Sequence, residues 1–133
     1  MAGSKRRDPH AELFGEFSEI VRGDRWQPAI DVFETEKAVV VRVELAGVHG
    51  ADVGVTVDGD QLHIRGTRKP PAVADSQRLH RMEIAFGPFE RAIQITIPFE
   101  REQVAAHLEE GYLSVVLPKR VPVRRRVDVQ NEE

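Results

Sequence analysis

Apolar and polar residues alternate with a period of two along the middle of this 133-residue chain. The pattern is clearest in "AVVVRVELAG" (38–47), "DVGVTVDG" (52–59), "QLHIRG" (61–66), "RAIQITIP" (91–98) and "VAAHLEEGYLSVVLP" (104–118). This period places alternate side chains on one face of a strand, whereas a helix needs a period near 3.6. No long helical pattern separates these segments, so we expect an all-β, immunoglobulin-like antiparallel sandwich.

Glycines mark two tight turns between the expected strands. Gly59 lies in "DGDQL" and suits a backbone position with positive φ. A second turn is expected at Glu110-Gly111, between a short strand and the strand that ends at Pro118.

Residues 1–25 are expected to form an N-terminal arm with a short helix. The stretch "DPHAELFGEFSEIV" (8–21) begins with a residue pair suited to a helix N-terminus. Its apolar side chains share one helical stripe: Leu13, Phe14, Phe17, Ile20 and Val21. Such a helix packs either on its own domain or against other chains and clients, and we favour the second interpretation.

Two further segments interrupt the alternating pattern of the strands. Residues 67–87 form a long connection with two adjacent prolines, and its second half, "RLHRMEI" (78–84), alternates like a strand. A strand at the end of a long loop can leave its own sheet and pair elsewhere. Residues 119–133 form an extended, polar tail that carries two apolar clasps, Val121-Pro122-Val123 and Val127-Asp128-Val129.

The clasps suit a tail that docks on a sheet edge as an added strand. Measured from Pro118, the first clasp has a reach of about 10 Å and the second about 30 Å. The longer reach favours Val127 and Val129 for crossing to a neighbouring chain, and Pro122 lacks the backbone amide that Asp128 keeps. The alternative is docking through Val121 and Val123.

Charge and residue types exclude several classes of function. Residues 27–118 hold nine basic and fourteen acidic side chains, a balance of −5, which disfavours a nucleic-acid partner. The basic run "KRVPVRRR" (119–126) has no aromatic residue to stack on bases, so we expect no specific nucleic-acid binding. No apolar run approaches the ~18 residues of a membrane span. No apolar stretch follows the basic residues near the start, so we expect no secretory signal and a cytoplasmic location.

Catalytic and metal sites are also not expected. The chain has no cysteine, and the five histidines show no metal-ligand spacing: His10, His49, His63, His80 and His107. Asp75, Ser76 and His80 have the residue types of a triad, but they lie in the long loop without a glycine elbow. We therefore expect no enzyme, no catalytic residue, no cofactor and no metal.

The order of these segments resembles the bacterial Hsp20/α-crystallin family of small heat shock proteins. Five stretches carry the resemblance: "WQPAIDVFE" (26–34), "VELAGV" (43–48), "LHIRGTR" (62–68), "LHRMEIAFGPFER" (79–91) and "AHLEEGYLSVVLPK" (106–119). The last resembles the family hallmark "A-x-x-x-N-G-x-L…L-P-K", with Glu110 in place of asparagine. Ala46 stands where the family usually has proline, and Val127-Asp128-Val129 occupies the usual place of "I-x-I".

The resemblance implies an α-crystallin domain at 26–118 and an ATP-independent holdase that binds unfolding proteins and does no covalent chemistry. It implies a dimer formed by swapping the loop strand, and larger homo-oligomers built through the arm and the tail. The implied dimer-interface residues are Leu79, Arg81, Met82, Glu83 and Arg91, and Arg91 is expected to pair with a carboxylate. The implied groove for the tail is lined by Val53, Val55, Val57, Val104, Ala106 and Leu108. Clients are expected on the arm, at Leu13, Phe14, Phe17 and Ile20.

One departure from the family pattern and one rival family remain. Family members often have Leu-Pro soon after the "F-x-R" strand, but here Ile95-Thr96 stand there and Pro98 follows. We expect that strand to be longer by a pair of residues. A p23-like co-chaperone shares the sandwich without holdase oligomers, and the long loop and the tail clasp favour the small heat shock protein.

Overall fold

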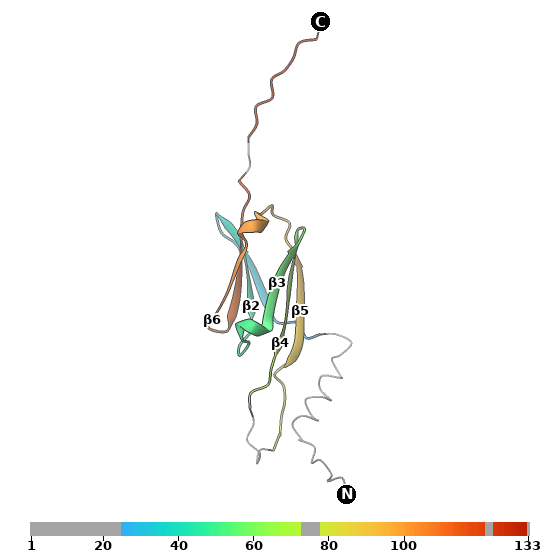
Figure 1. The fold of residues 1–133 in the computed structure, drawn as a ribbon, viewed down its shortest axis with the longest axis vertical. Coiled ribbons are helices and arrows are strands. Elements are labelled where there is room, and N and C mark those ends of the chain that lie inside the picture. The colour runs from blue at the N-terminus through green and yellow to red at the C-terminus, as the bar shows by residue number, and fades with distance from the viewer. Residues whose placement is uncertain (1–24, 73–77, 122–123, 133) are drawn as a thin grey trace.

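Two antiparallel sheets form the body of the protein, as the computed structural model shows for residues 25–72, 78–121 and 124–132 (Figure 1). The first sheet has the order β1-β2-β7-β6 and contains β1 (Ile30–Glu34), β2 (Ala38–Glu44), β7 (Tyr112–Pro118) and β6 (Ala105–Glu109). The second has the order β3-β4-β5 and contains β3 (Val53–Asp58), β4 (Gln61–Arg68) and β5 (Gly87–Gln94). Two 3-10 turns, η1 (Gly50–Asp52) and η2 (Arg101–Gln103), precede β3 and β6. The expected all-β sandwich is confirmed, while the expected arm helix lies outside the described residues.

The core lies between the sheets and is built from the inward positions of the alternating strands. Its most buried side chains are Val41, Val43, Leu45, Leu62, Ile64, Phe89, Val115 and Leu117, each with no exposed surface. Each such side chain contributes roughly 1.5–3 kcal/mol on burial. The period of two that the sequence shows is thus the period of this core.

Gly66 makes room for the largest core side chain. It occupies an inward position of β4, and a Cβ atom there would collide with the Asp52 carbonyl oxygen and the Phe89 ring. Gly66 pairs with Phe89 on β5, so the missing side chain provides the volume that the ring fills. A glycine within a strand often marks a close backbone approach of this kind.

The β6–β7 hairpin turns through two residues with positive φ. Glu110 has a φ of 52° and Gly111 a φ of 81°, which is the arrangement of a type I′ turn. The Gly111 carbonyl accepts a hydrogen bond of 2.7 Å from the Leu45 amide, which ties the turn to the end of β2. Gly59, with a φ of 63°, turns the chain from β3 into β4 as expected.

The expectation of a longer strand around Ile95 and Thr96 is wrong. β5 ends at Gln94, which pairs with Gln61, the first residue of β4. Beyond this pair the neighbouring strand has turned away, and the Ile95 amide donates to the Asp60 carbonyl at 2.8 Å. The strand therefore ends because its partner ends, before Pro98 is reached.

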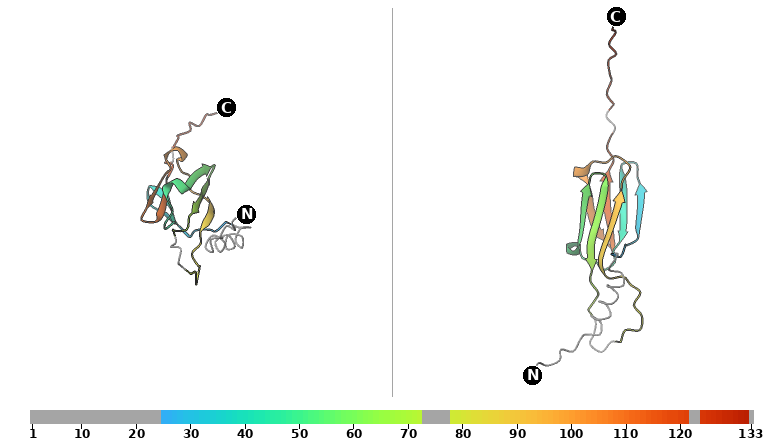
Figure 2. Two further views of the ribbon diagram at one scale, coloured as in Figure 1. Left: turned by 60° about the horizontal axis from the view of Figure 1, so that its bottom comes forward. Right: turned by 90° about the vertical axis from the view of Figure 1, so that its right-hand side faces the viewer.

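The long loop and the tail leave the sandwich at opposite ends (Figures 1 and 2). The loop connects β4 to β5, and its two stems are closed by the pair Arg68 and Gly87. At the other end, the amides of Lys119 and Arg120 donate to Lys37 and Pro98 carbonyls at 2.8 Å and 3.0 Å. The first two residues of the expected tail are therefore bound to the body.

Replacing Glu110 with asparagine is expected to stabilise the body by about 1 kcal/mol, because asparagine tolerates the left-handed conformation far better than glutamate. The measurement is the shift of the urea unfolding midpoint at fixed protein concentration. Glu109→Asn is the matched control, since Glu109 lies in β6 with ordinary strand geometry. An equal gain in both variants would contradict the turn-strain explanation.

Candidate functional site

The sandwich leaves open strand edges, and two of them lie on the same side of the molecule. β6 ends the first sheet and β3 begins the second. Figure 2 shows both strands along one side, with β1 on the other. An edge strand presents unpaired backbone N–H and C=O groups, which can pair with a segment of another chain. We refer to the exposed sides of β3 and β6 as the β3/β6 edge.

The positions expected to receive the tail lie on this β3/β6 edge. Val53, Val55 and Val57 are half-buried and pack against the core, while the alternate residues of β3 are exposed. On the β6 side, Val104 and Leu108 are also half-buried against the core, whereas Ala106 is exposed. The expected residues thus share the inward face of the two edges and form an apolar rim beside unpaired backbone.

β1 forms a third edge that the sequence analysis did not identify as a strand. Val32 pairs with the fully buried Val41 and so belongs to the inward face, yet it is 49% exposed. On the outer face, the Arg42 guanidinium lies 5.1 Å from the centre of the Phe33 ring. The available signal was short: Ile30 and Val32 stand on either side of the polar Asp31.

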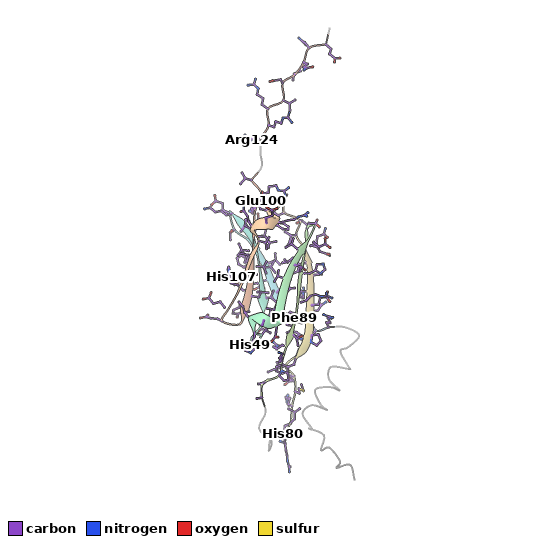
Figure 3. All side chains as sticks on the ribbon, in the orientation of Figure 1. His49, His80, Phe89, Glu100, His107 and Arg124 are labelled. Atoms are coloured by element: carbon purple, nitrogen blue, oxygen red, sulfur yellow. The ribbon has the colours of Figure 1, made fainter. Side chains whose placement is uncertain are left out.

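The loop segment expected to swap between subunits has no strand structure within the single chain, over residues 78–86. Leu79 is 41% exposed, and Met82 is half-buried. Arg81 and Glu83 pair with each other at 3.6 Å and remain largely exposed. In Figure 3, His80 marks the far part of the loop, away from the sandwich. The segment therefore presents Leu79, Arg81 and Glu83 to its surroundings, while Met82 is partly covered.

Arg91 lies on β5, where it is opposite Ile64 of β4 in the strand register. Its side chain is half-buried. Its Nη1 donates to the Pro28 carbonyl at 3.3 Å. Within the part of the chain that the structure describes, no carboxylate pairs with it. Arg91 thus contacts the segment that leads into β1, the open edge described above.

The tail is exposed beyond Arg120. Val121 is 77% exposed, Val127 75% and Val129 93%, and residues 124–132 have no regular secondary structure. Val123, the second residue of the alternative clasp, lies outside the described residues. So do the four expected client-binding residues of the arm: Leu13, Phe14, Phe17 and Ile20.

A buried arginine at the base of the loop is the main polar feature that sequence reasoning missed. Arg68 is 7% exposed, and its Nε and Nη2 donate to the Ala85 carbonyl at 2.9 Å and 2.7 Å. Its Nη1 donates to the Ala46 carbonyl at 3.3 Å. Among the described residues no carboxylate pairs with this guanidinium. Its charge is instead satisfied by carbonyl oxygens, which a buried charge requires.

Aromatic rings also contact this guanidinium. We call Arg68 together with Ala46, Ala85, Trp26 and Phe86 the Arg68 junction. The guanidinium carbon lies 4.4 Å from the Trp26 ring centre and 5.6 Å from the Phe86 ring centre. The Trp26 indole N–H donates to the Gly87 carbonyl at 2.9 Å, and its ring meets Phe89 edge-on at 5.2 Å. The sequence could have predicted this burial. Arg68 falls at every second position of β4 together with Leu62, Ile64 and Gly66, so its side chain is on the inward face.

The Arg68 junction joins four parts of the chain that are distant in sequence. Trp26 precedes β1, Arg68 ends β4, Ala46 follows β2, and Ala85 and Gly87 close the returning stem of the loop. Planar donors with several hydrogen bonds give this contact a defined geometry. It therefore sets where the long loop leaves the body.

The described residues expose strand edges that have apolar side chains beside them. Their histidine and carboxylate side chains nowhere gather in threes at a position that suits a metal ion. Over the same residues, no helix has the length and hydropathy needed to cross a membrane. The chemistry that the arrangement supports is backbone pairing together with apolar contact.

Comparison with known proteins gives one consistent result. Residues 31–130 match the model of the Hsp20/alpha crystallin family. Spore protein SP21 of Stigmatella aurantiaca is 35% identical over 103 residues, which cover 77% of this chain and 61% of that protein, less than two thirds of its length. The probable 15 kDa heat shock protein of Leptospira interrogans is 29% identical over 105 residues, covering 79% of each.

Solved structures give the same fold. A small heat-shock protein from Xylella fastidiosa has a TM-score of 0.69 and 29% identity, covering 81% of this chain and 100% of that one. Heat shock protein 16.0 from Schizosaccharomyces pombe has a TM-score of 0.67 and 30% identity, covering 80% and 100%.

Arg68→Lys is expected to lower the free energy of unfolding by about 2–3 kcal/mol, because lysine cannot keep the paired carbonyl bonds or the stacked plane. Arg65→Lys is the control: Arg65 lies on the same strand but is 60% exposed and pairs with Glu90 at 3.3 Å. The control should cost under about 1 kcal/mol. Trp26 is the only tryptophan, so its fluorescence during unfolding reports on this junction directly. Equal losses in the two variants would remove the special role of Arg68.

Proposed function

The chain belongs to the Hsp20/alpha crystallin family, and from this membership we propose that it is an ATP-independent holdase that binds unfolding proteins and prevents their aggregation. The observation that carries the proposal is the set of open edges with apolar side chains beside them, at β1 and along the β3/β6 edge. Such edges bind extended, apolar segments without regard to exact sequence, which suits varied unfolding clients. The function requires no cofactor and no covalent step.

The family match favours this function over the p23-like co-chaperone. A p23-like role would also need no swapped loop and no docking tail. The long loop and the tail extend from opposite ends of the body, which supports the proposal (Figure 1). We place the protein in the cytoplasm, in line with a chain that has no cysteine.

The proposed dimer forms when the loop segment of one subunit pairs with β1 of its partner. Val32 supports this arrangement, because an inward-facing valine that is 49% exposed lacks a covering strand. The exposed Leu79 and the half-buried Met82 are side chains that can supply that cover. Arg81 and Glu83 flank Met82, and Arg91 contacts the segment leading into β1.

The proposed larger assembly forms when Val127 and Val129 of one chain dock on the β3/β6 edge of another. Arg120 is hydrogen-bonded to the body, so tail reach is counted from that residue. Val121 follows Arg120 directly, so it cannot extend to a neighbouring chain. Val127 lies seven residues beyond Arg120, and an extended chain of that length spans about 24 Å. The anchored position of Arg120 therefore supports the second clasp over Val121 and Val123.

Clients are proposed to bind at two places. One is the arm, through Leu13, Phe14, Phe17 and Ile20. The other is the β3/β6 edge when the tail has left it. Because the same edge serves tail and client, dissociation of the tail supplies binding surface.

The holdase proposal predicts that the full chain suppresses light scattering by a thermally unfolding client without ATP. A chain truncated after Arg120 should form a smaller species by multi-angle light scattering, because it keeps the body but lacks Val127 and Val129. A small full-length species with no suppression at an equimolar ratio would contradict the proposal.

Replacing Val127 and Val129 with isoleucine is expected to slow subunit exchange about tenfold. Each added methylene contributes about 0.8 kcal/mol, and two contribute about 1.6 kcal/mol per clasp. Exchange is measured by native mass spectrometry after mixing isotope-labelled and unlabelled protein. The control replaces Val121 and Val123 with isoleucine and should leave the rate unchanged. Slower exchange in the control alone would identify the first clasp as the docking one.

A further inference from the structure

The outgoing stem of the long loop, which follows β4, is weakly held. Residues 69–72 are exposed. The Lys69 side chain is 69% exposed, and its Nζ lies 3.4 Å from a carboxylate oxygen of Asp52. An ion pair as exposed as this one contributes little to holding a chain in place. By sequence, residues 73–77 then separate this stem from the segment 78–84 that is proposed to swap, so the outgoing connection is long.

The returning stem becomes more buried as it approaches β5. Ile84 is 61% exposed, Ala85 and Phe86 are half-buried, and Gly87 is buried. The ladder between β4 and β5 ends at the pair of Arg68 and Gly87, so Ala85 lies beyond the last paired position. Strand pairing therefore does not hold Ala85, and a side chain has to do so.

Arg68 fixes Ala85 from inside the body. Its Nε and Nη2 both donate to the Ala85 carbonyl, at 2.9 Å and 2.7 Å, so a rigid fork of two donors closes on one oxygen. The guanidinium is itself held in place, because its Nη1 donates to the Ala46 carbonyl at 3.3 Å and the Trp26 ring centre lies 4.4 Å from its carbon. The fixed part of the returning stem thus extends past the ladder, from Gly87 out to Ala85.

Ala85 directly follows the segment 78–84, so no spacer residue separates that segment from its fixed end. The rest of the segment extends beyond the body, where His80 is labelled in Figure 3. A segment that is already held at one end loses less conformational entropy when it binds, which strengthens binding. Arg68 is 7% exposed, so it can have this effect without offering a contact to a partner.

We propose that Arg68 is a positioning residue for dimer formation. By fixing Ala85, it pre-organises the returning end of the loop segment for pairing with β1 of a second copy. This inference rests on the proposed swapped dimer and adds to it a residue that acts from the core of the body. The loop then has two unequal ends, a fixed returning end and a long outgoing connection. The affinity of the dimer depends on how directly the segment is joined to Ala85.

Glycine insertions in the full-length protein test this asymmetry without changing any side chain of the Arg68 junction. Two glycines between Ile84 and Ala85 should raise the dissociation constant of the dimer about tenfold, because more backbone must be ordered on pairing. The matched control places two glycines between Lys69 and Pro70. Lengthening an already long connection there should change the constant less than about twofold. The measurement is the share of single subunits in native mass spectra over a dilution series.

Arg68→Lys tests the residue itself. It should raise the dissociation constant about fivefold or more at a temperature well below its unfolding transition, where Trp26 fluorescence reports a folded body. Arg65→Lys is the control and should leave the constant unchanged. Arg68→Lys combined with the insertion between Ile84 and Ala85 should be little weaker than the insertion alone, because both changes remove the same fixed end. A purely structural role of Arg68 would instead give effects that add.

Equal effects of the two insertions, or full addition of the Arg68→Lys and insertion effects, overturn the inference. Met82→Asp separates it from the proposed dimer, because this change places a charge within the loop segment itself. If Met82→Asp weakens the dimer while Arg68→Lys and the insertion before Ala85 have no effect, the swapped dimer stands and the positioning role is wrong. If Met82→Asp leaves the dimer unchanged, the swapped dimer is wrong and the inference falls with it.

Discussion

A sandwich of two short, open sheets cannot satisfy all of its own backbone groups. Each sheet ends in two strands, so β1, β6, β3 and β5 carry a row of N–H and C=O groups without a neighbour on one side. Residues near Trp26 cover part of β5, through a bridge to Phe89. The remaining edges are where a second chain or an unfolding client can bind. In the proposed function, assembly and client binding are two uses of the same unpaired backbone.

The apolar side chains at these edges determine how strongly such partners bind. Val32 and the valines of β3 are only partly covered, so a docking segment gains apolar contact along with backbone pairing. A single valine pair gives little free energy after the cost of ordering a tail is subtracted. Many weak contacts within one assembly become effectively intramolecular, so the proposed assembly would be stable while each proposed clasp opens readily. A stable assembly with weak individual contacts suits a protein that exposes binding surface when a tail dissociates.

Unlike the weak contacts at the edges, the Arg68 junction is a fixed contact within the body. Its guanidinium is removed from water and held by three hydrogen bonds to carbonyl oxygens, two of them to Ala85, and by contact with Trp26. Losing any of these hydrogen bonds would be costly, because the charge is buried. The junction therefore holds the stem of the loop and the start of the domain together, while residues 69–72 and 78–81 of the loop are exposed. A rigid base and an exposed segment are what a swapped strand requires.

The sequence by itself determined the fold class, most of the strands, both hairpin turns and the family, because a period of two and a turn glycine act over neighbouring residues. It also indicated which side chains of β3 share a face, since alternation survives any arrangement of the sheets. It did not reveal that β5 ends at Gln94, because that limit depends on where β4 begins. Nor did it reveal β1 as an open edge or Arg68 as a buried charge. Only the tertiary structure decided these points, because an edge and a burial are defined by neighbours that are distant along the chain.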